Sequence, residues 1–249
     1  MQAIKRIAMW AVPRSLATVL FRAWENRPDT AVWDEPLLVP YIFLKGEDFG
    51  FTREQAIAGG RETDWVKVIS ELTGPLPEGK SIGYQKHQPH NLLEETMGIA
   101  WIEQLTNCFL IRDPKDMLLS LHKLVPKFTF EQTGWAALKK LFDYIHKTRG
   151  AIPPVIDARD LQDNPRRTLS LLCDAVGVEF TEAMLSWPAK DDSKLPDAEK
   201  PWYDAAWKST CFRPYKASTE ALPEQLVDTF EKCNEIYQFL RQYRCSTRH

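Results

Sequence analysis

The chain has 249 residues, of which 44% are hydrophobic and 27% are charged, the ordinary mixture of a globular protein with a full core. A formal net charge of −2 gives no general positive field to hold a nucleic acid, and no apolar run reaches membrane-spanning length. The five cysteines are scattered and never form a C-x-x-C pair, which argues against a disulfide framework or a zinc site. We therefore expect a cytoplasmic protein that binds neither nucleic acid nor membrane.

The first part of the chain alternates between strand and helix patterns. An apolar strand is predicted over 4–10, and after a short loop a helical pattern begins at Leu16. A second strand over 30–33 ends before Pro36, which stops it from continuing in the sheet. Residues 52–72 are predicted to be helical, with an interruption at two glycines.

The same alternation continues to the end of the chain, which predicts an α/β fold with an open, mainly parallel sheet flanked by helices. We expect a single domain over 1–249, with a polar and proline-bearing mobile loop at 188–201. The remaining predicted elements are strands over 81–85, 107–111 and 154–157 and helices over 92–105, 114–124, 130–149, 165–176 and 223–243.

Polar side chains follow four of the predicted strands. In a parallel sheet the carboxyl ends of the strands meet at one edge, where ligands bind. Three cations, a histidine and two carboxylates at this edge suit an anionic ligand together with a proton acceptor. The four groups are Arg14 with Ser15, Asp34 with Glu35, Lys86 with His87, and Arg112.

The loop before the first helix, Pro13-Arg14-Ser15-Leu16-Ala17-Thr18, is a candidate phosphate or sulfate site. The free N–H groups and the dipole of a helix N-terminus bind anions. The loop lacks the glycines and lysine of a Walker A sequence, which disfavours a kinase. A migrating sulfuryl group carries less negative charge than a phosphoryl group, so an arginine and amide donors can stabilise it, and we expect no metal.

These motifs resemble those of the sulfotransferases that use 3′-phosphoadenosine 5′-phosphosulfate (PAPS). Pro13-Arg14-Ser15 with Thr18 is similar to the family's 5′-phosphosulfate loop. The stretch 109–114, with Arg112, and the later Ser120 are similar to its 3′-phosphate site. The strings P-R-S-L and D-E-P-L resemble a divergent branch that is sometimes labelled aminotransferase-like.

The resemblance implies a P-loop NTPase-like sulfotransferase fold and transfer of a sulfuryl group from PAPS to a hydroxyl or amine of a small-molecule acceptor. Arg14, Ser15 and Thr18 would then bind the phosphosulfate, and Arg112 with Ser120 would bind the 3′-phosphate. Trp207 and Lys208 resemble the late W-[KR] segment that closes over the nucleotide, and a homodimer is possible.

Two residues compete for the role of the base that removes the acceptor's proton. Histidine titrates near neutrality, which favours His87, and the surrounding residues resemble the family's K-T-H-x-P. Glu35 is the rival, because some bacterial relatives of the family use a glutamate after the second strand. Lys86 and Arg14 are the candidate catalytic cations, the first as a contact of the sulfate and the second at the leaving phosphate oxygen.

Two other functions stay open at this point. A nucleotide-dependent kinase on a P-loop-like scaffold would bind ATP with magnesium, whereas a sulfotransferase would bind adenosine 3′,5′-bisphosphate without it. A non-catalytic nucleotide-binding relative is the second alternative, because Leu16 and Ala17 replace the glycine and the hydroxyl residue that are usual in the loop.

Overall fold

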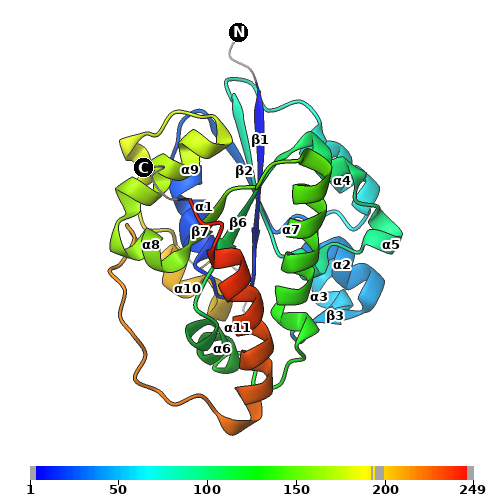
Figure 1. Ribbon diagram of the computed structural model, residues 1–249. Coiled ribbons are helices and arrows are strands. Elements are labelled where there is room, and N and C mark those ends of the chain that lie inside the picture. Colours follow the sequence, from blue (N-terminus) through cyan, green and yellow to red (C-terminus); the bar gives the residue numbers. More distant parts are fainter. Residues whose placement is uncertain (1–3, 192, 194–198, 246–249) are drawn as a thin grey trace.

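The computed structural model describes residues 4–191, 193 and 199–245, and a parallel sheet runs through its centre (Figure 1). The order of the strands is β2-β5-β1-β6-β7, and each neighbouring pair is parallel. This arrangement confirms the open, parallel α/β sheet predicted from the sequence. The strands are β1 (Lys5–Ala11), β2 (Thr30–Asp34), β5 (Ile82–His87), β6 (Thr106–Ile111) and β7 (Val155–Asp157).

Helices cover both faces of the sheet, so its strands are buried on two sides. Along β1, Met9 packs into one apolar cluster and Trp10 into the other, because successive side chains point to opposite faces. The Met9 face is covered by α1 (Ala17–Glu25), α8 (Ala158–Asp163) and α9 (Pro165–Val176). The Trp10 face is covered by α4 (Trp65–Thr73), α6 (Pro114–His122), α7 (Trp135–Arg149) and α11 (Val227–Arg241).

The central strand β1 has β5 on one side and β6 on the other. After β1 the chain builds the β2–β5 side of the sheet first and then crosses to form β6 and β7. A parallel sheet whose strand order reverses in this way leaves a crevice at the carboxyl ends of the strands beside the reversal. The topology therefore places a binding crevice beyond the end of β1.

The first elements between β2 and β5 are ones that the sequence pattern left unassigned. Helix α2 (Leu38–Lys45) leads into a short antiparallel hairpin of β3 (Glu47–Asp48) and β4 (Phe51–Thr52). Helix α3 (Arg53–Ala58) then begins with a capping box, and the predicted interruption at the two glycines separates it from α4.

The single helix predicted over 92–105 is wrong. The segment instead contains α5 (Glu94–Met97) and η2 (Ala100–Gln104), and η1 (Pro89–Asn91) precedes it. Gly98, with φ of 67°, ends α5, because an α-helix cannot continue through a left-handed residue. In the segment predicted as a helix over 130–149, Gly134 with φ of 77° directly precedes α7, and only the short η3 (Glu131–Thr133) lies before it.

The last third of the chain contains the region predicted as a mobile loop. Residues 192 and 194–198 of the predicted loop 188–201 lie outside the described residues, and α10 (Lys200–Trp207) begins within it. The short helices η4 (Glu182–Met184) and η5 (Glu224–Leu226) precede α10 and α11, respectively. Among the described residues we find no helix with the length and apolar character needed to cross a membrane.

Candidate functional site

A cavity lies beyond the carboxyl end of β1, where the topology predicts a crevice. Its wall includes residues 11–19, the hairpin between α2 and α3, and one face of α10. Every described non-glycine residue with a positive φ contributes to this wall, and strained backbone of this kind concentrates at functional sites. These residues are Arg14, Leu16, Glu35 and Phe49.

The first turn of α1 faces this cavity, and its backbone N–H groups can bind an anion. Leu16 has φ of 71° and precedes Ala17, the first residue of α1, and its side chain makes no capping hydrogen bond. Leu16 therefore adopts the left-handed conformation that a glycine provides most readily. Residues 15–18 all line the cavity, so the free N–H groups of this turn are available to a phosphate or sulfate.

Two arginines meet at one side of the cavity. Arg14 Nε donates to Ser120 Oγ at 3.1 Å, and Arg14 Nη1 donates to the carbonyl oxygen of Trp202 at 3.1 Å. Arg112 Nη1 donates to the carbonyl oxygen of Arg14 at 2.7 Å, and Arg112 Nε is buried without a partner among the described residues. All these acceptors are neutral, so among the described residues neither guanidinium group is hydrogen-bonded to a carboxylate.

Electrostatics shows the same need for an anion. Burial, and after it the positive charge of Arg112, lowers the pKa of Arg14. Burial also lowers the pKa of Arg112, against the attraction of nearby acidic groups. A ligand that carries phosphate charge would relieve both effects, because arginine binds phosphate oxygens through its planar fork of N–H donors.

The expected assignment separated Arg14, at the phosphosulfate, from Arg112 and Ser120, at the 3′-phosphate. The structure brings the three together, with the guanidinium of Arg14 on the hydroxyl of Ser120. Ser15 and Thr18 also lie at the cavity, but the hydroxyl of Ser15 donates to the carbonyl oxygen of Val12 at 2.7 Å. The backbone N–H of Ser15, not its hydroxyl, is therefore the group left for a ligand.

Lys86 is the centre of a second polar cluster on the cavity wall. Its Nζ lies 2.7 Å from Asp34 Oδ1 and 2.9 Å from Glu35 Oε1, and it donates to Thr18 Oγ1 at 2.9 Å. The ring of Tyr203 lies below the same ammonium group, with 5.3 Å between Nζ and the ring centroid. Lys86 is only 3% exposed, so these contacts replace water.

The charges in this cluster support one another. Burial lowers the pKa of Lys86, but the attraction of Asp34 and Glu35 outweighs it and the pKa is raised. Burial raises the pKa of Glu35, but Lys86 outweighs that effect and the pKa lies below its usual range. Burial dominates for Asp34, whose pKa is raised. At neutral pH the cavity therefore contains a Lys86 ammonium beside a Glu35 carboxylate.

The structure does not bring His87 to the cavity. Its ring stacks on Trp10 with 4.5 Å between centroids, and its Nε2 lies 3.1 Å from Gln85 Oε1. Since β5 extends to His87, the side chains of Lys86 and His87 point to opposite faces of the sheet. Burial lowers the pKa of His87 to about 3, so the ring is neutral and enclosed in the core.

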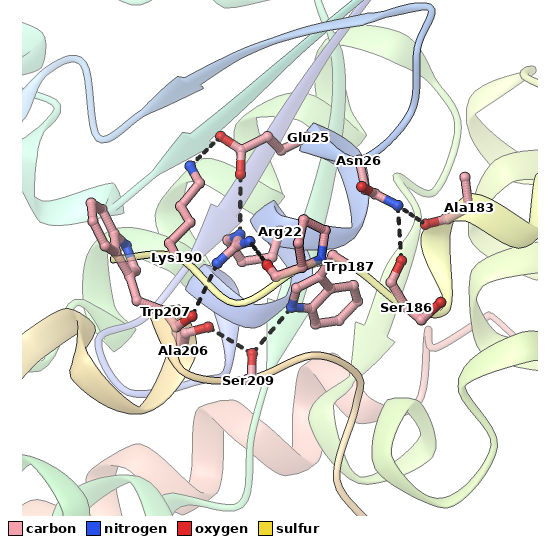
Figure 2. A network of polar contacts seen from close by, with 11 residues as sticks. Arg22, Glu25, Asn26, Ala183, Ser186, Trp187, Lys190, Ala206, Trp207 and Ser209 are labelled. Carbon is pink, nitrogen blue, oxygen red and sulfur yellow. Dashed lines mark hydrogen bonds and ion pairs between the residues drawn. The ribbon is translucent and has the colours of Figure 1, made fainter. Parts of the chain in front are cut away.

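Trp207 and Lys208 also lie apart from the cavity wall. The carbonyl oxygen of Trp207 accepts a hydrogen bond from Arg22 Nη1 in a separate polar network (Figure 2). Lys208 forms an ion pair with Asp204 on its own helix. The residues of α10 that line the cavity come from its preceding turn, and the sequence reasoning missed them although they share one helical face. They are Trp202, Tyr203, Ala205 and Ala206.

Comparison with known proteins identifies the family of this sequence. The model of the sulfotransferase domain family matches residues 5–236. Branched-chain-amino-acid aminotransferase-like protein 2 of Arabidopsis thaliana is 29% identical to this chain, and the match covers 98% of this chain. Branched-chain-amino-acid aminotransferase-like protein 1 of the same organism is 28% identical, and the match covers 95% of this chain. The chain spans 42% of the length of each of these relatives.

Solved structures show the same fold. The sulfotransferase domain from the Synechococcus PCC 7002 olefin synthase is similar with a TM-score of 0.56 and 16% identity, over 93% of this chain and 95% of that one. A sulfotransferase from Alicyclobacillus acidocaldarius is similar with a TM-score of 0.54 and 12% identity, over 96% of both chains. These likenesses confirm the predicted P-loop-like sulfotransferase fold, and the family match over nearly the whole sequence shows that this chain belongs to the sulfotransferase domain family.

Proposed function

We propose that this chain transfers a sulfuryl group from PAPS to a hydroxyl or amine of a small-molecule acceptor. The observation that carries the proposal is the pair of guanidinium groups of Arg14 and Arg112, which have neutral partners and lie beside the uncapped start of α1. A nucleotide with a 3′-phosphate and a 5′-phosphosulfate supplies two anionic groups. The arginine pair and the helix start are two separate places to bind them.

The buried polar atoms fit this donor. Arg112 Nε has no partner in the described part of the chain, and Ser120 Oγ already lies within hydrogen-bond distance of Arg14, so this group suits the 3′-phosphate. The N–H groups of residues 15–18, together with Thr18, suit the 5′-phosphosulfate. PAPS would supply the sulfuryl group and a stable leaving group.

Glu35 is the base in this proposal. It lines the cavity as an ionised carboxylate, whereas His87 lies in the core. Glu35 accepts the proton of the acceptor as the acceptor oxygen or nitrogen bonds to sulfur and the bond from sulfur to the phosphate oxygen breaks. A carboxylate with a low pKa is a weak base, but the pKa of Glu35 is low because the positive charge of Lys86 lies beside it. Movement of the Lys86 ammonium toward the sulfate would return basicity to Glu35 when it is needed.

Lys86 has a geometry that suits this double role. Its Nζ contacts Glu35 on one side and Thr18, in the first turn of α1, on the other. An ammonium held between the base and the anion-binding turn can stabilise negative charge that develops on the transferred group.

Thermal unfolding with two nucleotides tests the proposal. We expect adenosine 3′,5′-bisphosphate to raise the melting temperature without magnesium, and mass spectrometry to detect an acceptor that gains one sulfuryl group from PAPS. Stabilisation by ATP with magnesium, and none by the bisphosphate, would instead indicate a kinase. Binding of the bisphosphate without sulfation of any acceptor in a broad library would indicate a non-catalytic relative.

Three further features stay predictions from the sequence: a single domain over 1–249, a cytoplasmic location and a homodimer. Light scattering of the purified chain measures the oligomeric state directly. Fractionation of cells that express the tagged chain measures the location.

A further inference from the structure

The cavity wall contains a buried carboxylate to which the proposed reaction assigns no role. Asp48, in β3, lines the cavity, and its side chain is 2% exposed. Its Oδ2 lies 3.0 Å from His90 Nε2 and accepts a longer hydrogen bond from Asn91 Nδ2 at 3.5 Å. Its Oδ1 is buried and has no partner among the described residues. Buried carboxylate oxygens are normally hydrogen-bonded, so Oδ1 calls for a donor that the residues described by the structure do not supply.

His90 fixes the orientation of Asp48. The edges of Tyr41 and Phe49 pack against the His90 ring with centroid distances of 5.8 and 5.7 Å. Gly134 packs next to the ring, since a Cβ atom built on it would lie in ordinary contact with His90 Nδ1, at 3.5 Å. His90 is therefore confined on several sides and presents Nε2 to Oδ2 of Asp48, which leaves Oδ1 for a ligand.

Apolar groups surround this carboxylate on the cavity wall. Phe49 has φ of 50°, an uncommon conformation for a bulky residue, and its ring lies 5.3 Å from the ring of Trp202. Phe49 and Gly50 both have positive φ, as a two-residue hairpin turn requires. The strained turn thus brings an aromatic ring next to a buried carboxylate, which is the combination that binds organic cations.

The balance of charge at this end of the cavity also favours a cation. Glu35 and Asp48 contribute two carboxylates to the wall, and Lys86 contributes one ammonium group that already contacts Glu35 and the neighbouring Asp34. Glu199 also lines the cavity, and its partner is the exposed Arg61 at 2.9 Å. The cations Arg14 and Arg112 lie with Ser120, at the end assigned to the donor.

We propose that Asp48 determines acceptor specificity by binding a protonated amine on an acceptor whose apolar body packs against Phe49, Phe51 and Trp202. The inference rests on the proposed function, which makes this end of the cavity the acceptor end. The amine bound by Asp48 is a recognition group, and a different group of the acceptor, next to Glu35, receives the sulfuryl group. His90 is a positioning residue for Asp48.

Three small probes of matched shape test the inference by calorimetry on the full chain: 2-phenylethylamine, 2-phenylethanol and phenylacetate. With adenosine 3′,5′-bisphosphate present, we expect the amine to bind at least about tenfold more tightly than the alcohol, and phenylacetate to bind most weakly. Asp48→Asn should remove the preference for the amine. The control Glu47→Gln, at the exposed neighbour in the same strand, should keep it.

Equal affinity of the wild-type chain for the amine and the alcohol, or no detectable binding of the amine, overturns the inference, even if Asp48→Asn fails to fold. Binding is measured without sulfuryl transfer, so the two proposals fail separately. A chain that binds the bisphosphate but does not prefer the amine contradicts only the role of Asp48. A chain that prefers the amine but binds no bisphosphate contradicts the proposed sulfotransferase reaction.

Discussion

The guanidinium group of Arg112 donates a hydrogen bond of 2.7 Å to the carbonyl oxygen of Arg14, and so joins the loop after β1 to the end of β6. The side chain of Arg14 continues the connection to Ser120 in α6. Arg112 therefore holds the position of the anion-binding loop and also supplies charge to the cavity. Its second role can be measured because one N–H donor, Nε, has no partner among the described residues.

Arg112→Ala should weaken the affinity for adenosine 3′,5′-bisphosphate by about tenfold to a hundredfold, because charge-assisted hydrogen bonds to the 3′-phosphate are lost. Affinity for adenosine 5′-monophosphate, which lacks that phosphate, should fall less, only by the part of the loss that comes from the loop contact of Arg112. Calorimetry with both nucleotides measures the difference. Arg159→Ala is the matched control, since Arg159 is an exposed arginine that pairs with Asp163. Equal losses for the two nucleotides would contradict the assigned 3′-phosphate site.

Glu35→Gln should lower kcat by about a hundredfold or more while the affinity for the bisphosphate stays within a few-fold of the wild type, because the base is removed and the donor site is intact. His87→Phe should leave kcat nearly unchanged, since the ring lies on the face of β5 away from the cavity. Single-turnover sulfation of an identified acceptor provides the measurement. A larger loss for His87→Phe in a folded variant would restore histidine as the base.

The sheet and its binding edge were predictable because they depend on short-range patterns. Continuous apolar runs predict strands buried on both faces, and the carboxyl ends of such strands bring Arg14, Glu35, Lys86 and Arg112 to one cavity. The position of His87 was not predictable in the same way. The orientation of its side chain depends on where β5 ends. The predicted strand ended at residue 85, whereas β5 continues to His87, and the alternation of side chains along the strand then places the ring in the core.

The acceptor end was missed for a different physical reason. The strands of the hairpin that carries Asp48 and Phe49 are two residues each, too short for a recognisable alternation. Their positions depend on tertiary contacts with His90 and Trp202, which are distant in sequence. A phenylalanine before a glycine was the one local sign of a tight turn, and it does not reveal which cavity the turn faces.

The polar network around Arg22 connects α10 to α1 (Figure 2). Arg22 is 2% exposed and donates to the carbonyl oxygens of Pro188, at 2.6 Å, and Trp207, while its Nε contacts Glu25. Arg22→Met should lower the free energy of unfolding by about 2–4 kcal/mol, because these acceptors lose their donor in a partly dry environment. Urea denaturation measures this loss.

Lys190→Met is the control for the same network. Lys190 contacts Glu25 at 2.6 Å, but its side chain is 36% exposed, so its removal should cost less than about 1 kcal/mol. Similar losses for the two variants would show that the network does not depend on Arg22. This network supports the cavity, because it holds α10, which carries Trp202 and Tyr203 to the cavity wall.

Burial of neutral His87 should make folding stability depend on pH. Burial lowers the pKa of this histidine from 6.5 to about 3, so between these values the unfolded chain binds one more proton than the folded chain. Its contribution to stability is fully present above pH 6.5 and is lost as the pH falls, by about 1 kcal/mol per unit. His87→Phe keeps the ring packed on Trp10 and should flatten the dependence between pH 6.5 and 5. Urea titrations at each pH measure the slope, and identical slopes for wild type and His87→Phe would contradict the buried neutral state.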